Sequence, residues 1–448
     1  MSETAAKPGA GGSNSGKSGS EEPPAVRGPL AFLQVFGPGL ITGASDDDPS
    51  GIATYSQTGA QYGYGLEWTL LFSWPLMCAI QEISARIGRV TGHGIAGNLK
   101  RAYPSGLVLT LVGLVVVANT INLGADLGAM AAALKLLIGG PLWLLIAAFA
   151  VLSVLLEIFV SYKRYAAILK WLALSLLAYV GVAFAVKAPW GEVAWNLVAP
   201  SMKFDVGALT VVVAVLGTTI SPYLFFWQAS EEAEEVEGDP KAQALRRSPD
   251  QAKAAFRRIR IDTYLGMALS NTVALFIMIA TAATLHAHGV TNIQTSAQAA
   301  EALKPVAGPL VFFVFAIGIV GTGLLAVPVL AGSGAYALGE VLGWTTGLDR
   351  KWNKAKRFYA VIAAATLVGG LINFSGLDPI KALFWSAVIN GVVAVPVMVM
   401  MMHMSSHRKI MGDFTLSPTL KIAGWLATAV MAAAAVGMFV TMAMGGGV

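Results

Sequence analysis

The sequence predicts an all-α polytopic membrane protein, and three observations support this prediction. Of the 448 residues, 56% are hydrophobic and only 12% are charged, with a mean hydropathy of +0.66. A soluble globular domain of this length is far more polar. The apolar residues also form runs long enough to cross a bilayer as helices, and Lys and Arg are concentrated in alternate connections between these runs.

Eleven apolar runs are long enough to span a membrane. They lie at about 32–62, 66–87, 107–133, 141–160, 165–187, 206–228, 261–285, 308–336, 357–373, 379–402 and 420–444. The sequence therefore predicts eleven transmembrane helices. Residues 1–30 are rich in Gly, Ser, Pro and charge, which is typical of a disordered tail, and they lack the apolar core of a cleaved signal peptide.

The basic residues give an orientation to these spans. They occur in the tail and in the second, fourth, sixth, eighth and tenth connections, whereas the intervening loops have few, with Lys304 the main exception. Because cytoplasmic loops carry the excess of Lys and Arg, we expect a cytoplasmic N-terminus and an extracytoplasmic C-terminus, in an inner or plasma membrane. The net charge of +5 gives no reason to expect a nucleic-acid partner, so the expected partners are the bilayer and a transported solute.

Three consecutive carboxylates interrupt the first span, within Gly43–Gly51. An acidic side chain at bilayer depth costs about 2.5–3.5 kcal/mol, so it normally faces a cavity or a partner. Asp48 followed by Pro49 has the residues of an N-cap and a first helical turn. We therefore predict a break and then a restarted half-helix. Free carbonyls and a carboxylate at such a break can form a cation site.

The sixth span repeats this pattern with Gly217, a short polar stretch, and then Ser221-Pro222. Two interrupted spans, five apart, indicate two inverted five-helix repeats whose breaks meet near the membrane midplane. The predicted organisation is a first repeat at 31–187, a second at 206–402 with a cytoplasmic loop at 229–260, and an additional helix at 420–444.

Three further stretches stand out: Gly37-Pro38-Gly39-Leu40, Asp48-Pro49 and the segment 81–92, QEISARIGRVTG. In these residues the chain resembles the NRAMP family of divalent-metal transporters, and the likeness extends over about 30–445. The resemblance implies a LeuT-like fold, with a metal bound between helices 1 and 6.

The departures from the family pattern imply a harder metal. The family motif Asp-Pro-Gly-Asn here ends in Ser50-Gly51, so the amide ligand is lost, and Met-Pro-His is replaced by Ser221-Pro222-Tyr223. This pattern is most similar to the NRAMP-related magnesium transporter branch. Soft sulfur ligands favour Mn and Fe over Mg, whereas Mg²⁺ takes oxygen ligands and keeps part of its water.

We expect Asp48 to be the main direct ligand, helped by Ser221 and by the carbonyls near Thr218 and Thr219. Asp46 and Asp47 would act through water, and Gly51 would leave room for that water. Mg²⁺ or Mn²⁺ is then the transported substrate, and no cofactor is expected. On helix three, Asn119, Asn122 and Asp126 are expected to make interhelical hydrogen bonds, as is Asn390 on the tenth span.

Uncoupled uptake by a monomer, using alternating access, is the preferred interpretation. The family's proton-route positions fall at Tyr223, Asn122 and Ala125, which leaves no obvious relay. A proton-coupled Mn²⁺/Fe²⁺ symporter, with Asp126 replacing the lost carboxylate, and a LeuT-fold organic-solute symporter stay as alternatives. An enzyme is not expected, because the chain has no zinc-protease, nucleophile-elbow or P-loop motif. The acidic run at 231–237 is either a solvated helix extension paired with arginines or a metal-attracting entrance.

Overall fold

The computed structural model describes residues 38–160, 174–200, 206–238, 240–348, 350–376 and 378–444. The expected disordered tail at 1–30 lies outside these residues. The first part of the expected fifth span, up to residue 173, also lies outside them, so the structure describes that span only from residue 174 onwards.

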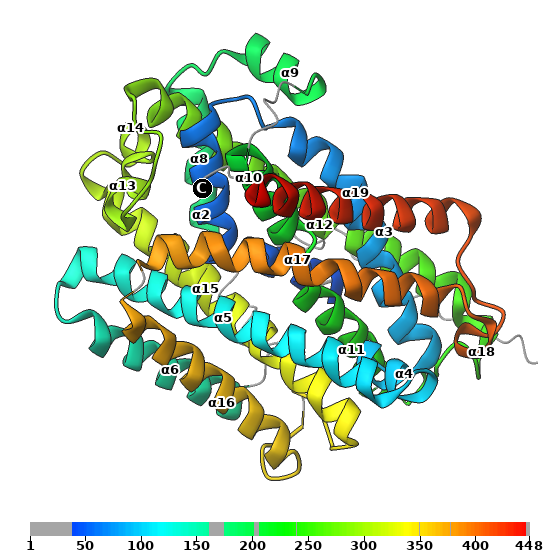
Figure 1. Cartoon of the computed structure of the whole chain (residues 1–448). Coiled ribbons are helices and arrows are strands. Elements are labelled where there is room, and N and C mark those ends of the chain that lie inside the picture. Colours follow the sequence, from blue (N-terminus) through cyan, green and yellow to red (C-terminus); the bar gives the residue numbers. More distant parts are fainter. Residues whose placement is uncertain are drawn as a thin grey trace, which may run out of the picture. The chain divides into compact units, whose positions relative to one another are not determined.

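All the regular elements of the described part are helices (Figure 1). The longer ones are α1 (Pro38–Asp46), α2 (Pro49–Tyr62), α3 (Trp68–Thr91), α4 (Ile95–Ala102), α5 (Ser105–Ile138), α6 (Leu142–Phe159), α8 (Leu177–Ala185), α9 (Trp190–Val198), α10 (Val206–Thr219), α11 (Pro222–Gly238), α12 (Ala252–Thr284), α15 (Val311–Leu342), α16 (Lys356–Ile372), α17 (Pro379–Ser405) and α19 (Pro418–Ala443). Three short ones are α13 (Ser296–Glu301), α14 (Lys304–Ala307) and α18 (Arg408–Met411).

Eight segments of the described part are long and apolar enough to cross a membrane. The other three expected spans correspond to the interrupted α1–α2, to the more polar α3, and to the partly described span that contains α8. Helix α11 continues to Gly238 and α12 begins at Ala252. Helical structure therefore covers much of the range 229–260, which the sequence suggested as a loop.

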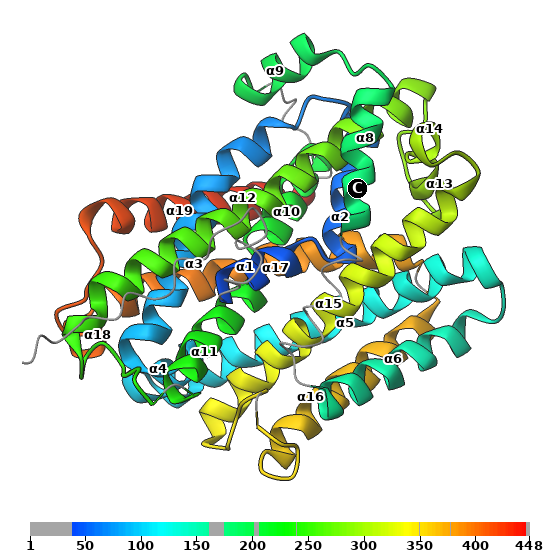
Figure 2. The same ribbon diagram turned by 180° about the vertical axis from the view of Figure 1, so that it is seen from behind.

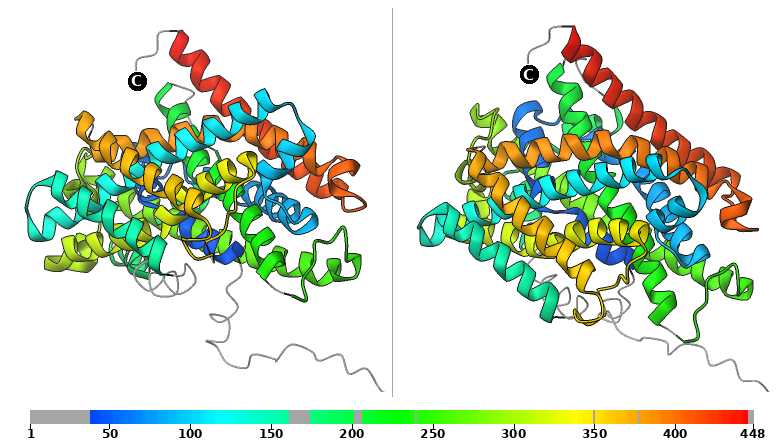
Figure 3. Two further views of the ribbon diagram at one scale, coloured as in Figure 1. Left: turned by 90° about the horizontal axis from the view of Figure 1, so that it is seen from below. Right: turned by 60° about the horizontal axis from the view of Figure 1, so that its bottom comes forward.

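The interrupted helices α10 and α11 lie in the interior of the bundle. In the most apolar part of the segment Val206–Gly238, 94% of the residues are buried, against 28% in α6 and 28% in α19. Figure 3 shows α19, in red, along the outside of the bundle. The outer helices expose large apolar side chains such as Phe159 and Phe439, as expected where a helix faces lipid.

Both predicted helix breaks are present. Helix α1 ends at Asp46 and α2 begins at Pro49, while α10 ends at Thr219 and α11 begins at Pro222. The two breaks lie together, because α1 packs against α11 and α2 packs against α10. Figure 2 shows α1 between α12 and α15, and it packs against both.

Glycines permit close contacts between several of these helices. A Cβ atom at Gly43 of α1 would overlap the backbone of Gly266 in α12, and one at Gly217 of α10 would overlap the backbone at Ala387 and Gly391 of α17. Small residues at such positions are typical of membrane helix pairs, because they let two backbones approach. The half-helices that form the breaks are therefore held by backbone contact on at least one side.

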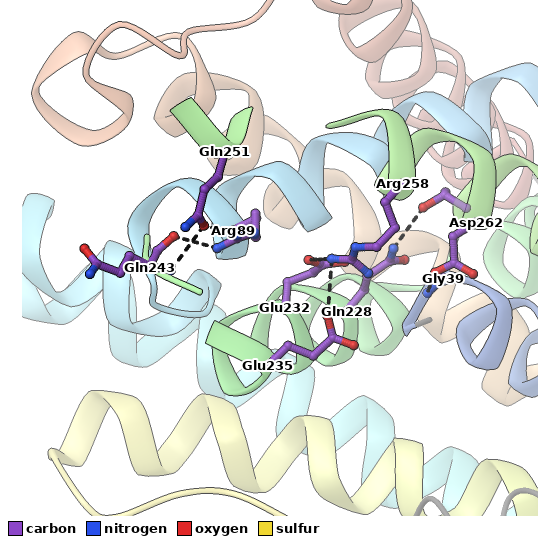
Figure 4. Close-up of polar contacts among 10 residues, drawn as sticks. Gly39, Arg89, Gln228, Glu232, Glu235, Gln243, Gln251, Arg258 and Asp262 are labelled. Atoms are coloured by element: carbon purple, nitrogen blue, oxygen red, sulfur yellow. Dashed lines mark hydrogen bonds and ion pairs between the residues drawn. The ribbon is translucent and has the colours of Figure 1, made fainter. Parts of the chain in front are cut away.

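Polar contacts join the helices at the end of the bundle that carries α4 and α18. The Glu232 carboxylate of α11 pairs with Arg258 of α12 at 2.5 Å, and Glu235 pairs with the same guanidinium at 3.3 Å (Figure 4). Further along α11, Glu237 pairs with Arg350 at 2.7 Å, and the Tyr336 hydroxyl of α15 donates to Glu234. The acidic run thus continues α11 and pairs with arginines, as one interpretation had it, but it is not solvated throughout, because Glu232 is buried. The metal-attracting role stays a prediction.

Candidate metal site at the two helix breaks

Asp48 is the N-cap of α2, as the sequence predicted. Its Oδ1 accepts hydrogen bonds from the Gly51 backbone N–H and from the Ser50 hydroxyl, both at 2.7 Å. Its Oδ2 accepts from Asn122 Nδ2 at 3.0 Å and from the Tyr223 hydroxyl at 3.4 Å. An ionised carboxylate has about four acceptor positions, so a metal ion must replace one of these donors. The long contact from Tyr223 is the weakest of the four.

Asn122 of α5 connects Asp48 to two further helices. Its Nδ2 donates to Asp48 and also to Asp126 Oδ2, at 3.2 Å, while its Oδ1 accepts from Asn390 Nδ2 of α17 at 3.0 Å. Asn119, one turn earlier, donates to the Leu330 carbonyl of α15 at 3.1 Å. The expected interhelical hydrogen bonds of Asn119, Asn122 and Asn390 are therefore confirmed.

Asp126 lies beside the first break. Its side chain is fully buried, it interacts with the Ser50 backbone N–H, and its Oδ1 has no hydrogen-bond partner within the described part of the chain. Asp126 therefore places a second carboxylate next to Asn122, on the side of α2 that faces α5.

Asp46 and Asp47 lie on another side of the break. Ser270 of α12 is within hydrogen-bond distance of both carboxylates, at 2.6 Å from Asp46 Oδ2 and 3.1 Å from Asp47 Oδ1. A hydroxyl has one proton, so it serves one carboxylate at a time. The consecutive carboxylates are thus divided, with Asp46 and Asp47 next to α12 and Asp48 next to α5.

At the second break, side-chain hydroxyls occupy the carbonyls that end α10. Ser221 Oγ lies 2.6 Å from the Gly217 carbonyl and 2.9 Å from the Thr218 carbonyl, and its one proton can serve either of them. Thr219 Oγ1 donates to the Val215 carbonyl at 3.0 Å. The Ser221 oxygen keeps its lone pairs when it donates in this way. Its predicted role as a ligand, and that of the carbonyls near Thr218 and Thr219, stays a prediction.

The two breaks are in direct contact. A Cβ atom on Gly51 would lie 3.0 Å from Thr218 Oγ1 and 3.3 Å from the Asp46 carbonyl oxygen, and the Tyr223 hydroxyl is 3.4 Å from the Ser45 carbonyl. All the residues predicted as ligands lie on these two breaks and are buried: Asp46, Asp47, Asp48, Gly51, Thr218, Thr219 and Ser221.

Within the described residues, no basic side chain pairs with the carboxylates at the breaks. Four carboxylates, those of Asp46, Asp47, Asp48 and Asp126, are at most 6% exposed. Their hydrogen-bond donors are hydroxyl, amide and backbone N–H groups, and no ion pair to Lys, Arg or His joins them within the described residues. Buried charges without a counter-charge are costly. Among the residues that the structure describes, the site therefore has no positively charged partner.

No group of three or more His, Cys, Asp or Glu side chains in the described part is arranged to hold a metal ion by itself. A bound cation would therefore need hydroxyl, amide, carbonyl or water oxygens besides the carboxylates. Ser50, Ser270 and Asn390 contact the predicted site residues or their partners but were not among the predicted ligands. Ser270 was recognisable only as a polar residue in an apolar run.

The sequence matches a known protein family over most of its length. Residues 39–441 match the family model described as natural resistance-associated macrophage protein-like, Nramp. The chain belongs to the Nramp family. The sequence is 25% identical over 414 residues to a protein of Deinococcus radiodurans named divalent metal cation transporter MntH, covering 91% of this chain and 89% of the relative. It is 30% identical over 300 residues to a MntH of Xanthomonas campestris pv. campestris, covering 66% and 65% of the two chains.

Solved structures confirm the LeuT-like fold expected of an Nramp protein. A variant of the manganese transporter of Eremococcus coleocola superposes with a TM-score of 0.70 at 17% identity, covering 92% of this chain and 86% of that one. MhsT in complex with L-phenylalanine gives a TM-score of 0.59 at 13% identity, covering 90% and 97%, and Mhp1 gives 0.57 at 14%, covering 91% and 92%. These structural similarities show the fold alone. This fold is that of a multi-pass membrane protein.

Proposed function

We propose that this Nramp-family protein carries a divalent metal cation across the membrane by alternating access, with Mg²⁺ as the preferred ion and Mn²⁺ also accepted. One observation carries the proposal: four buried carboxylates at two facing helix breaks have only neutral hydrogen-bond partners in the described structure. A transported cation supplies the missing charge. The names of the MntH relatives support the same substrate class.

The atoms around Asp48 are those of a site that prefers Mg²⁺. The groups around Asp48 are a serine hydroxyl, a tyrosine hydroxyl, an asparagine amide and a backbone N–H. With Ser221 and Tyr223 at the second break, the site offers oxygen in place of a thioether and an imidazole. Oxygen-only sites suit Mg²⁺, which keeps several waters and binds to one or two carboxylates, whereas sulfur ligands favour softer ions.

Uptake without proton coupling is energetically sufficient for a divalent ion. The membrane potential contributes about 2.3 kcal/mol per elementary charge per 100 mV, and Mg²⁺ carries two charges. The asparagine at position 122 binds Asp48 as a hydrogen-bond donor, and an amide side chain does not titrate as a carboxylate does.

Isothermal titration of the purified protein with Mg²⁺ and with Mn²⁺ tests the ion site. We expect both signals to disappear in Asp48→Ala. Because this substitution also removes a helix cap, which costs about 1 kcal/mol, Asp48→Asn is needed beside it. The asparagine can still accept from Gly51 but has no charge. Asp413→Ala removes an exposed carboxylate and serves as the control. Binding that persists in a folded Asp48→Asn protein would contradict the proposal.

A second candidate function is proton-coupled transport of Mn²⁺ or Fe²⁺. The observation in its favour is the Asp126 carboxylate, which shares the Asn122 amide with Asp48. Reconstituted vesicles containing a pH-sensitive dye distinguish the two functions. Uncoupled transport predicts Mg²⁺ or Mn²⁺ entry without internal acidification, in wild type and in Asp126→Asn. Acidification that accompanies metal entry and disappears in Asp126→Asn would establish the coupled function instead.

An organic-solute symporter fits this site less well. Mhp1 and MhsT share the fold, but four buried carboxylates at the breaks would repel the carboxylate of an amino acid.

A further inference from the structure

A basic cavity away from the metal site is lined by residues of α4 and α18, among others. These two helices lie at the same end of the bundle (Figures 1 and 2). Its volume is about 390 Å³, and none of its described lining residues is acidic. Its basic lining residues come from the α3–α4 connection, α4, the segment after α11, and the α17–α18 region: His93, Arg101, Arg246, His403, His407 and Lys409. This end of the bundle is the predicted cytoplasmic side.

The positive charge of the basic cavity is only partly balanced within the described structure, because Arg101 interacts electrostatically with the buried Glu340 carboxylate of α15. Arg101, Arg246 and Lys409 are exposed, and none of them forms an ion pair with a described carboxylate. The Arg246 guanidinium instead donates to the Ile410 carbonyl at 3.2 Å, which fixes its direction. Burial and then Arg101 lower the pKa of the His93 imidazole, with Arg247 adding to this effect and Glu237 opposing it. Burial and the nearby arginines therefore make the protonated form of His93 less favourable.

The walls of the basic cavity are held in place by hydrogen bonds, some within the α3–α4 connection and some between segments far apart in the sequence. Asn98 Nδ2 donates to the His93 and Gly94 carbonyls at 2.9 and 2.8 Å, which fixes the α3–α4 connection. The Arg246 backbone N–H donates to the Val90 carbonyl at 3.2 Å. Tyr103, at the end of α4, shares a hydrogen bond with His403 of α17. The cavity is thus formed before any ligand enters.

The size and the donors of the basic cavity define the ligand class. A volume of this size is within the range of small-molecule sites. Arginine presents paired N–H donors that match phosphate oxygens, and lysine and histidine add further positive charge. A carboxylate monoanion would neutralise only a part of the charge from Arg101, Arg246 and Lys409, whereas a phosphate group offers several acceptor oxygens with more charge.

We propose that the basic cavity binds a phosphate-bearing anion. The phosphate belongs either to a soluble polyphosphate such as a nucleotide or to the headgroup of an anionic lipid at the membrane surface. The bound anion bridges α4, the segment after α11, and the α17–α18 region, so it stabilises the arrangement of these segments. This site shares no residue with the metal site, and its occupancy does not depend on which ion is transported.

Binding measurements on the full-length protein in uncharged detergent test this proposal. ATP and inorganic pyrophosphate are titrated by calorimetry in metal-free buffer with EDTA, because Mg²⁺ would bind both ligands. In a second arm, native mass spectrometry compares the retention of phosphatidylglycerol and phosphatidylcholine. The cavity variant combines Arg101→Gln, Arg246→Gln and Lys409→Gln. The control removes the same charge from exposed residues outside the cavity, with Lys351→Gln, Lys354→Gln and Lys381→Gln.

We expect the cavity variant to bind at least tenfold more weakly than wild type, and the control to bind as wild type does. A response to ATP or pyrophosphate identifies a soluble ligand, and selective retention of phosphatidylglycerol alone identifies a lipid. If the triple variant does not fold, the single exposed substitution Lys409→Gln replaces it, with a smaller but measurable loss. The proposal is wrong if wild type binds none of these probes saturably, or if the folded cavity variant keeps wild-type affinity.

Discussion

At the scale of single residues, Gly51 shows how a missing side chain shapes the candidate site. The Asp48 cap depends on the Gly51 backbone N–H, so this residue has a role even without a side chain. A Cβ at this position would come within 3.0 Å of Thr218 Oγ1, a hydroxyl that can rotate, and within 3.3 Å of the Asp46 carbonyl, which cannot. Glycine therefore lets the two breaks approach closely, and the room for water expected at this position stays a prediction.

The double substitution Gly51→Asn with Ser221→Met should shift ion preference towards Mn²⁺. It adds an amide oxygen and a thioether sulfur, and sulfur favours the softer ion. We expect the ratio of Mn²⁺ to Mg²⁺ affinity to rise at least tenfold, which corresponds to about 1.4 kcal/mol, as measured by titration with each ion. Ser221→Ala, which removes the hydroxyl without adding sulfur, is the matched control. An unchanged ratio in the double variant would show that these positions do not set selectivity.

At the scale of helices, the start of α1 is held by a neighbouring helix. The Gly39 backbone N–H donates to Asp262 Oδ2 of α12 at 2.7 Å (Figure 4), and Asp262 lies one turn from Arg258, which pairs with Glu232 of α11. The first turn of a helix has free N–H groups that need acceptors. Asp262 therefore couples α1 to the same helix that receives the acidic side chains of α11.

Removing this acceptor should loosen α1 selectively. We expect Asp262→Ala to cost about 1–2 kcal/mol locally, as the loss of a helix cap does, and hydrogen exchange in α1 to become roughly tenfold faster. Asp378→Ala removes the cap of α17, where Asp378 accepts from Ile380 N–H at 2.9 Å, and should affect exchange only near the start of α17. If α1 exchanges at the wild-type rate in Asp262→Ala, the Gly39 contact does not hold this helix.

At the scale of the whole molecule, the breaks were predictable and the surroundings of the site were not. Asp48-Pro49 and Ser221-Pro222 are readable because proline cannot continue a helix and a polar residue before it can cap the next one. In contrast, the direction of a carboxylate depends on how its helix is rotated against its neighbours. For this reason the sequence did not show that Asp46 and Asp47 lie next to Ser270.

The sequence also did not show which side chains pair between segments that are far apart along the chain. In one of the two interpretations, arginines pair with the acidic run of α11. Arg258 does so, but Arg350, about a hundred residues further along the chain, pairs with Glu237. Likewise, Asp126 was recognisable as an acidic residue in an apolar span, but only the packing of α5 against α2 brings it next to Ser50.

The contact between Gly43 of α1 and Gly266 of α12 leaves no room for a side chain on α1. A Cβ atom at position 43 would lie 2.4 Å from the Gly266 carbonyl group, and backbone cannot move aside as the end of a side chain can. Any larger residue at position 43 would therefore push the two helices apart and separate the Asp46 and Asp47 carboxylates from Ser270.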